Sequence, residues 1–281
     1  MSEQQETWQG APQRVDRALQ ELGLARSRTA AQKAVAAGQV SVNGVAVTKT
    51  GAQVRSGQRV AVTGTDHYVS RGAHKLIGAL DTFSIPVEGR VALDVGASTG
   101  GFTQVLLERG IDTVLAIDVG HGQLDPSLLG HERVRLFEGC NARYLTAETL
   151  AEGTGDERAP DLIVGDLSFI SLTQVLPALT AVQARSADIM MLIKPQFEVG
   201  REGIGDGVVT DPKLQHAAVQ RVLESALELG LSVVGLTESP IVGSHGNREF
   251  LVHLRAQPAA QMSVINEMMA QVVLGEGSAR E

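Results

Sequence analysis

The stretch Val91-Ala92-Leu93-Asp94-Val95-Gly96-Ala97-Ser98-Thr99-Gly100-Gly101-Phe102 joins an apolar run to a glycine-rich turn. The apolar run predicts a buried strand of a parallel sheet, and the glycines after it let the backbone approach a ligand closely. A dinucleotide-binding turn would read G-x-G-x-x-G, whereas this one reads D-x-G-x-x-x-G. An acidic residue two positions before the first glycine suits a ligand that carries an ammonium group. We therefore expect a cofactor site here that is not built for a dinucleotide.

The chain from about Ser70 onward alternates strand-like and helical segments. Apolar runs suited to strands recur at 113–118, 134–137, 161–165, 188–193, 231–237 and 250–254, and helical patterns lie between several of them, for example at 214–229. This alternation predicts an α/β fold with a doubly wound, mostly parallel, Rossmann-like sheet. Ligands bind beyond the carboxyl ends of the strands in such sheets, so polar residues just after a strand are the candidates for the site.

Polar residues follow three further strands of this expected sheet. Asp118 ends the second strand and is placed to accept hydrogen bonds from ribose hydroxyls, and Asn141 and Asp166 follow the third and fourth strands around an adenosine. An ammonium group, a ribose and an adenine together indicate S-adenosylmethionine as the cofactor. For Asn141 a turn-forming role is an alternative. The candidate cofactor-binding residues are Asp94, Gly96, Ser98, Gly100, Gly101, Phe102, Asp118, Asn141 and Asp166.

Four separated segments, 70–75, 165–169, 194–198 and 246–249, carry polar residues that a packed core does not need. Methyl transfer to a hydroxyl requires an activated oxygen in line with the methyl group. A lysine is a weak base at its reference pKa of about 10.4, but burial and a neighbouring cation depress that value. We therefore expect Lys194 as the base, with Lys75 as the neighbouring cation and Asp166 and Glu249 holding both amines. A structural ion-pair cluster is the alternative.

The net charge of −8 argues against a nucleic-acid partner until its distribution is considered. Residues 11–63 hold eight basic and two acidic side chains, a net +6, whereas residues 64–281 hold 16 basic and 28 acidic ones, a net −12. A small basic module attached to a larger acidic one indicates that RNA binding and chemistry are divided between them. The candidate RNA-binding residues are Arg14, Arg17, Arg26, Arg28, Lys33 and, in the second region, Arg71.

Within the basic module, local signals predict two helices followed by a β-hairpin. Apolar residues have helical spacing at 14–22, Ser27 is a good N-cap for a second helix that stops at Gly38, and the run 40–47 alternates around Asn43-Gly44. The pattern Arg14-Val15-Asp16-x-x-Leu19, followed by Ser27-Arg28 and Val40-x-Val42-Asn43-Gly44, resembles the RNA-binding fold named after small-subunit ribosomal protein S-four. That fold presents basic side chains to structured RNA.

The set Lys75, Asp166, Lys194 and Glu249 resembles the K-D-K-E tetrad of the FtsJ-like ribose 2′-O-methyltransferases. With the basic module in front, the chain from about residue 14 to 256 resembles the TlyA (hemolysin A) family of ribosomal RNA methyltransferases. The resemblance implies methyl transfer from S-adenosylmethionine to the 2′-hydroxyl of cytidine in 16S and/or 23S ribosomal RNA, within ribosomal subunits. No residue of the sequence decides between the small-subunit site, the large-subunit site or both.

This resemblance and the patterns above divide the chain into five parts. We expect a disordered tail at 1–10, an S-four-like RNA-binding domain at 11–64 and a linker at 65–69. A methyltransferase domain at 70–258 and a C-terminal helix and tail at 259–281 follow. The oligomeric state is left open.

Composition excludes several other classes of protein. The lone Cys140 excludes an intramolecular disulfide and a cysteine-based metal cluster, and His74 and His121 lack partners at ligand spacing, so we expect no metal. The polar N-terminus is no signal peptide, and no run approaches the roughly 20 apolar residues of a membrane span. We therefore expect a cytoplasmic protein with no membrane partner, which disfavours a membrane-lytic hemolysin. A non-enzymatic RNA-binding or ribosome assembly factor stays an alternative, as does methylation of a base.

Overall fold

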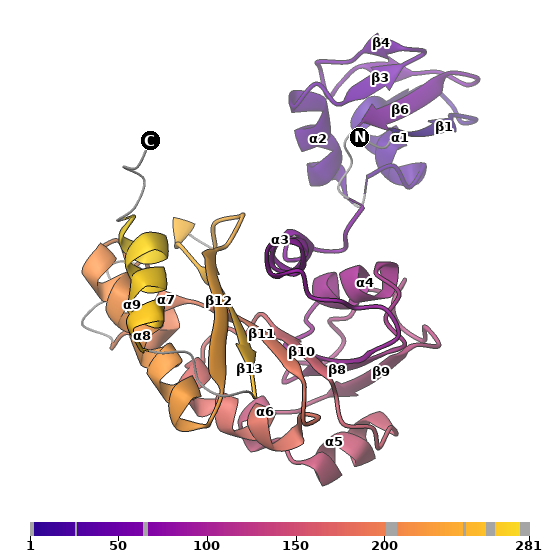
Figure 1. The fold of residues 1–281 in the computed structure, drawn as a ribbon. Helices are drawn as coiled ribbons and strands as arrows, with labels where there is room; N and C mark the ends of the chain where they lie inside the picture. The colour runs from indigo at the N-terminus through magenta and orange to yellow at the C-terminus, as the bar shows by residue number, and fades with distance from the viewer. Residues whose placement is uncertain are drawn as a thin grey trace. The chain divides into compact units, whose positions relative to one another are not determined.

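The computed structural model describes residues 3–25, 27–63, 67–200, 207–243, 246–256 and 262–275. The chain divides into two compact units, Met1–His67 and Tyr68–Glu281 (Figure 1). The first unit has a hydrophobic core of its own, built on residues such as Leu19, Val35 and Val62.

The first unit is a small α+β fold with a four-stranded antiparallel sheet in the order β1-β6-β3-β4. Its elements are β1 (Glu3–Thr7), β2 (Gln13–Arg14), α1 (Val15–Glu21), α2 (Arg28–Ala36), β3 (Val40–Val42), β4 (Val45–Ala46), β5 (Gln53–Val54) and β6 (Arg59–Thr63). The Ser27 side chain accepts a hydrogen bond from Ala30 N, so it caps α2 as predicted. The hairpin of β3 and β4 turns at Asn43 and Gly44, which have φ angles of 51° and 79°. The predicted helix pair and hairpin are confirmed.

The N-terminal segment differs from its prediction. β1 pairs with β6 along its whole length, from Glu3 opposite Thr63 to Thr7 opposite Arg59, and Trp8 is buried in the core of this unit. The prediction of a disordered tail at 1–10 is therefore wrong for residues 3–10. The described side chains of β1 are all exposed, so an edge strand of this kind carries no alternation of polar and apolar residues that the sequence would reveal.

The second unit is built on a seven-stranded sheet in the order β12-β13-β11-β10-β7-β8-β9. Its strands are β7 (Val91–Val95), β8 (Thr113–Asp118), β9 (Val134–Glu138), β10 (Leu162–Gly165), β11 (Asp188–Ile193), β12 (Ser232–Glu238) and β13 (Phe250–Arg255). Its helices are α3 (Ala73–Phe83), α4 (Gly101–Glu108), η1 (Ala142–Tyr144), α5 (Ala147–Thr154), η2 (Leu172–Gln174), α6 (Leu176–Val182), α7 (Pro195–Glu198), α8 (Pro212–Glu228), α9 (Met262–Met269) and η5 (Ala270–Leu274). β13 runs antiparallel to β11 and β12, whereas β7 to β11 pair in parallel.

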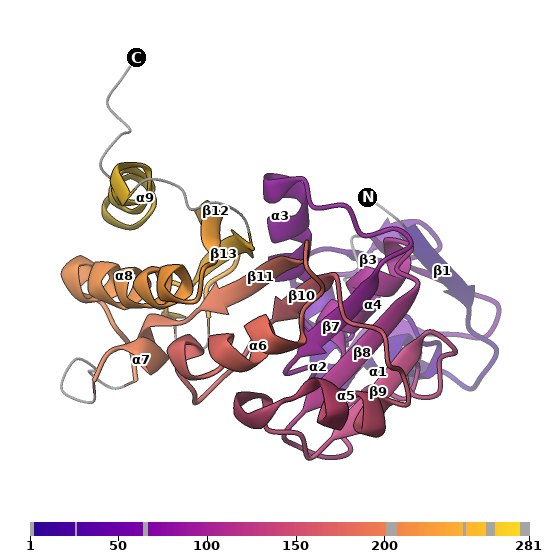
Figure 2. The same ribbon diagram turned by 60° about the horizontal axis from the view of Figure 1, so that its bottom comes forward.

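Helices cover both faces of this sheet (Figures 1 and 2). Alternate strand residues such as Ala92, Val114 and Val164 join α3 and α4 in one core cluster. Their sequence neighbours, such as Leu93, Leu115 and Ile163, pack with α5, α6, α8 and α9 in another. The predicted doubly wound, mostly parallel fold is confirmed. Strand order reverses between β7 and β10, and a ligand site is expected at the carboxyl ends of these strands.

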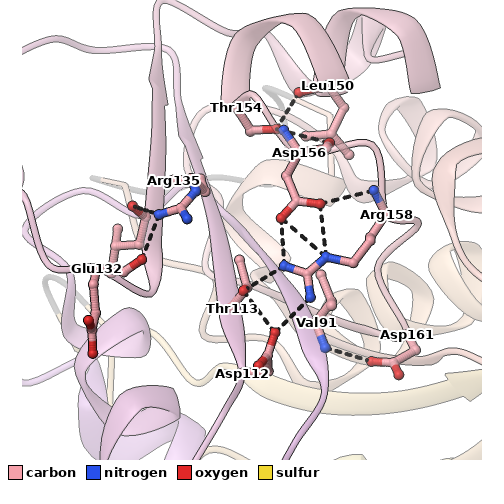
Figure 3. A network of polar contacts seen from close by, with 11 residues as sticks. Val91, Asp112, Thr113, Glu132, Arg135, Leu150, Thr154, Asp156, Arg158 and Asp161 are labelled. Carbon is pink, nitrogen blue, oxygen red and sulfur yellow. Dashed lines mark hydrogen bonds and ion pairs between the residues drawn. The ribbon is translucent and has the colours of Figure 1, made fainter.

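The opposite, amino-terminal edge of the sheet is tied by a surface network around Arg158 (Figure 3). Arg158 Nη1 lies 2.7 Å from Asp112 Oδ2, and Nη2 lies 2.6 Å from Asp156 Oδ2 and 2.7 Å from Thr113 Oγ1. These contacts join the loop before β10 to the start of β8. Arg158 is half exposed, so the network contributes modestly to stability. The network lies at the edge opposite the carboxyl ends of the parallel strands.

The last described segment, α9 and η5, agrees with the C-terminal helix expected within 259–281. Ile265, Met269 and Val273 of this segment join the core that holds α8 and β12. Arg248 Nη1 donates to the carbonyl of Val273, which links the helix end to the segment before β13. Among the described residues, no helix combines the length and the apolarity needed to cross a lipid bilayer.

Candidate active site

A cavity of about 690 Å³ opens beyond the carboxyl ends of β7, β8, β10 and β11. Its volume is in the range of pockets that enclose a small organic ligand. All four predicted catalytic residues and Arg71 line it. It is also lined by most of the predicted cofactor residues: Gly96, Ser98, Gly101, Phe102, Asp118, Asn141 and Asp166. Asp94 and Gly100 lie outside this lining.

Gly100 serves the packing of the turn. It precedes α4 with a φ of 94°, and a Cβ at this position would lie 2.4 Å from Leu128 Cδ1. Gly101 permits a second close approach, between the start of α4 and Ser70, since a Cβ at this position would lie 2.2 Å from Ser70 Oγ. Gly100 therefore lets the loop after β8 pack on the turn, and Gly101 lets the segment before α3 approach α4.

Asp94, at 1% exposed, is buried beneath the turn. Its Oδ2 accepts a hydrogen bond of 2.7 Å from Thr103 Oγ1, whereas its Oδ1 has no hydrogen-bond partner among the described residues. Burial raises the pKa of Asp94 to about 7 against the opposing effect of the Thr103 hydrogen bond, and the charges of Asp166 and Asp118 raise it further. Asp94 thus offers a buried acceptor that the described protein groups leave unused.

Asp118 and Asn141 shape two loops that line the cavity. The carboxylate of Asp118 accepts hydrogen bonds from Ser98 N at 2.8 Å and Gly120 N at 2.7 Å. Asn141 caps η1 by accepting from Arg143 N at 3.1 Å while it also lines the cavity. The turn-forming role that the sequence left open for Asn141 is therefore present, together with a position suitable for contacting a ligand.

Four side chains from distant segments converge on one side of the cavity. Lys75 comes from α3, Asp166 follows β10, Lys194 follows β11 and Glu249 precedes β13. Lys75 Nζ lies 3.0 Å from Asp166 Oδ2 and 2.8 Å from Glu249 Oε2. Lys194 Nζ lies 2.6 Å from Asp166 Oδ1 and donates to Ser168 Oγ at 2.9 Å. Asp166 therefore bridges two buried lysines.

Asp166 is the anion at the centre of this cluster. Burial by itself disfavours its charge, but the ammonium groups of Lys194 and Lys75 outweigh that effect and hold the pKa of Asp166 below its usual value. The carboxylate is thus ionised at neutral pH, and it fixes the positions of both amines.

A carboxylate outside the predicted set, that of Glu198, joins two loops of the site, and the sequence did not predict this role. Glu198, 3% exposed in α7, accepts hydrogen bonds from Ser171 Oγ and, at 2.8 Å, from Leu172 N. Burial raises the pKa of Glu198, while the bonds from Ser171 and Leu172 oppose this effect. Glu198 thereby holds the loop after β10 against the loop after β11. Its motif was noted in the sequence, but no spacing rule connects it to Ser171.

An aromatic pair stands at the same loops. Phe169 is 91% exposed and has a φ of 64°, a strained conformation for a bulky residue. Its ring centroid lies 5.2 Å from that of Phe197. A large apolar ring held in solvent beside a cavity is suited to stack on a flat ligand.

The basic candidates of the first unit fall into two groups. Arg14 and Arg28 each form an ion pair of 3.0 Å with the fully buried Asp16. Hydrogen bonds from the arginines, that of Arg14 first, outweigh the effect of burial and hold the pKa of Asp16 well below its usual range. The two arginines therefore have a structural role, with 41% and 45% of their side chains exposed. Arg17 and Lys33 are exposed, and Arg26 lies outside the described residues.

Comparisons with known proteins agree with this arrangement. The FtsJ-like methyltransferase family matches residues 68–256, and the S4 domain matches residues 13–60. A relative from Mycobacterium tuberculosis, the 16S/23S rRNA (cytidine-2′-O)-methyltransferase TlyA, is 48% identical over 254 residues, covering 89% of this chain and 92% of the relative. The chain belongs to the TlyA family.

Other members of the TlyA family carry a different name. Hemolysin A of Brachyspira hyodysenteriae is 37% identical, with 85% of this chain and 98% of that protein covered. A solved structure described as a putative hemolysin from Streptococcus thermophilus is 40% identical, with a TM-score of 0.69, covering 93% of this chain and 95% of that one. The predicted family and fold are therefore confirmed.

Proposed function

We propose that this protein transfers the methyl group of S-adenosylmethionine to the ribose 2′-hydroxyl of cytidine in ribosomal RNA, with Lys194 as the base. The observation that carries the proposal is the cluster of Lys75, Asp166, Lys194 and Glu249 on the wall of the cavity. The activity named for the M. tuberculosis relative supports the substrate.

The residues present fit S-adenosylmethionine. The glycine-rich turn lines the cavity through Gly96, Ser98 and Gly101. Asp94 Oδ1 is an acceptor beneath that turn, unpaired among the described residues, so a contact between Asp94 and the ammonium group of the cofactor would require the turn to open. Asp118 at the end of β8 suits ribose hydroxyls, and Asn141 and Phe102 line the cavity where an adenosine would lie. When bound, the sulfonium supplies an electrophilic methyl group.

The two lysines differ in a way that favours Lys194 as the base. Lys75 Nζ contacts two carboxylates, Asp166 and Glu249. Lys194 contacts one carboxylate and the neutral hydroxyl of Ser168. Bound S-adenosylmethionine would supply the methyl group and would leave as the neutral thioether once the 2′-oxygen has taken that group. The role of this chain in that step is to accept the 2′-hydroxyl proton at Lys194 Nζ.

RNA is held, in this proposal, mainly by the basic first unit. Arg17 and Lys33 are exposed for phosphate contacts, and Arg71 lies at the cavity in the second unit. Phe169, next to Phe197, is placed to stack on a base splayed out of its helix. The substrate is the 16S site, the 23S site or both, within ribosomal subunits of the cytoplasm.

Methyl transfer by a lysine variant tests this proposal. Lys194→Ala should reduce transfer from labelled S-adenosylmethionine to isolated ribosomal subunits to background while it leaves cofactor binding nearly unchanged. Lys213→Ala, which alters an exposed lysine of α8, is the matched control and should be fully active. Transfer at the wild-type rate by Lys194→Ala would refute the base assignment.

Calorimetry with S-adenosylmethionine separates the enzyme from an RNA-binding assembly factor. We expect saturable binding of the cofactor to the full-length chain. No binding at millimolar cofactor would favour the assembly factor and overturn the proposed reaction.

A further inference from the structure

The contacts of Lys194 leave one direction around its nitrogen for a substrate. A neutral lysine amine has two N–H bonds and one lone pair. Asp166 Oδ1 and Ser168 Oγ lie 2.6 Å and 2.9 Å from Lys194 Nζ, and both are acceptors. When Ser168 Oγ accepts a hydrogen bond from one N–H and the other N–H points to the ion-paired Asp166 Oδ1, the lone pair occupies the remaining direction.

From this geometry we propose that Ser168 is a positioning residue that orients the lone pair of Lys194 toward the reacting hydroxyl. The inference rests on the proposed function and adds a fifth residue to the tetrad. Asp166 alone would leave the amine able to rotate about its Cε–Nζ bond. A second acceptor, placed in a different direction from Nζ, stops that rotation and so holds the lone pair in one orientation. The lone pair can then face the 2′-hydroxyl while its oxygen lies in line with the methyl group.

The position of the Ser168 hydroxyl is fixed on both sides along the chain. On one side, Leu167 packs over the turn, where a Cβ on Gly96 would lie 3.0 Å from Leu167 Cδ2. On the other side, the carboxylate of Glu198 binds Ser171 Oγ and Leu172 N. The loop that carries Ser168 is therefore held to the loop that carries Lys194, which makes their contact a built feature of the site.

The nature of the second acceptor suits a base. A carboxylate in place of Ser168 would put a second negative charge beside Lys194 Nζ, as Glu249 does beside Lys75 Nζ. A hydroxyl accepts the hydrogen bond without adding a negative charge. Phe197, whose ring centroid lies 6.0 Å from Lys194 Nζ, provides an aromatic face at a longer distance and no hydrogen-bonding atom.

Three serine variants test the role of Ser168 in single-turnover methyl transfer with saturating cofactor and ribosomal subunits. Ser168→Ala should slow the transfer step by roughly tenfold to a hundredfold, with dissociation constants for cofactor and RNA within about twofold of wild type. Ser168→Thr keeps the hydroxyl and should restore most of the rate. Ser186→Ala changes an exposed serine before the other end of β11 and is the matched control.

The pH profile separates orientation from a change in proton affinity. The deficit of Ser168→Ala should persist at about pH 9, because orientation is lost at every pH. A deficit that disappears at high pH would overturn the proposal, as would wild-type transfer by Ser168→Ala or equal losses in the alanine and threonine variants. Because Ser168 is exposed at the cavity surface, alanine leaves both hydrophobic cores intact.

Lys194→Ala, measured in the same experiment, keeps the two claims apart. If it abolishes transfer while Ser168→Ala does not slow it, only the role of Ser168 fails. If Lys194→Ala retains transfer, the base assignment and the role of Ser168 fail together.

Discussion

Asp94 makes the stability of this protein depend on pH in a direction unusual for a carboxylate. Burial raises its pKa from 3.8 to about 7. The folded state therefore binds a proton that the unfolded chain releases between about pH 4 and about pH 7, and the free energy of unfolding falls as pH rises through this window. Since one pKa unit corresponds to about 1.4 kcal/mol, full ionisation of Asp94 costs the folded state on the order of 4 kcal/mol.

Asp94→Asn removes this ionisation and keeps the shape of the side chain. In urea unfolding of the second unit, the variant should gain stability relative to wild type by roughly 2–3 kcal/mol as pH goes from about 5 to about 8. Thr103→Val removes the hydrogen bond that lowers the pKa of Asp94, so it should move the transition to higher pH. A difference between Asp94→Asn and wild type that is the same at both pH values would refute the reasoning.

A direct contact between Asp94 and the cofactor would make cofactor binding depend on pH. If the ammonium of S-adenosylmethionine contacts Asp94 Oδ1, binding requires the ionised carboxylate, so the wild-type affinity should rise roughly 15-fold between about pH 5.5 and about pH 7. Calorimetry on Asp94→Asn should show no such rise. An equal affinity of the wild-type protein at both pH values would exclude the ammonium contact.

Three further variants, one of them a double substitution, probe RNA recognition and the first unit. Asp16→Ala should destabilise that unit by about 1–3 kcal/mol in thermal or urea unfolding, since it removes the acceptor of Arg14, Arg28 and Gln32; an unchanged melting curve would contradict this. The double change Arg17→Ala and Lys33→Ala should keep the fold but weaken RNA binding, with the slope of log affinity against log salt falling by about one unit per lost phosphate contact; an unchanged slope would remove both from the interface. Phe169→Ala should lower kcat/KM for RNA by about tenfold to a hundredfold, the worth of one stacked base, with unchanged cofactor affinity; unaltered kinetics would exclude stacking.

The sequence predicted the parts of this fold that repeat along the chain. Runs such as Val91–Val95 and Asp188–Ile193 are strands buried on both faces, so each is mostly apolar, with one aspartate, and stands out against the neighbouring helices. The residues that follow these strands meet at one edge because parallel strands share a direction. The sequence therefore predicts that Asp166 and Lys194 lie close together, and their side chains are 2.6 Å apart in the structure.

Features that depend on side-chain pairing across the fold could not be predicted. The polar edge strand β1 has no periodic signal, and the role of Arg14 and Arg28 in neutralising buried Asp16 requires knowing that Asp16 faces the helix pair. The contacts of Ser168 with Lys194 and of Glu198 with Ser171 join loops 26 and 27 residues apart. Spacing along the chain carries no information on such a pair.

Identification of the modified nucleoside tests the central claim most directly. Ribosomal subunits lacking the modification are incubated with the full-length protein and S-adenosylmethionine, and the RNA is digested to nucleosides and analysed by mass spectrometry. We predict new 2′-O-methylcytidine, at a site that primer extension at low nucleotide concentration then locates, and none with Lys194→Ala. A methyl group on the cytosine ring, or 2′-O-methylcytidine formed at the wild-type rate by Lys194→Ala, would contradict the account.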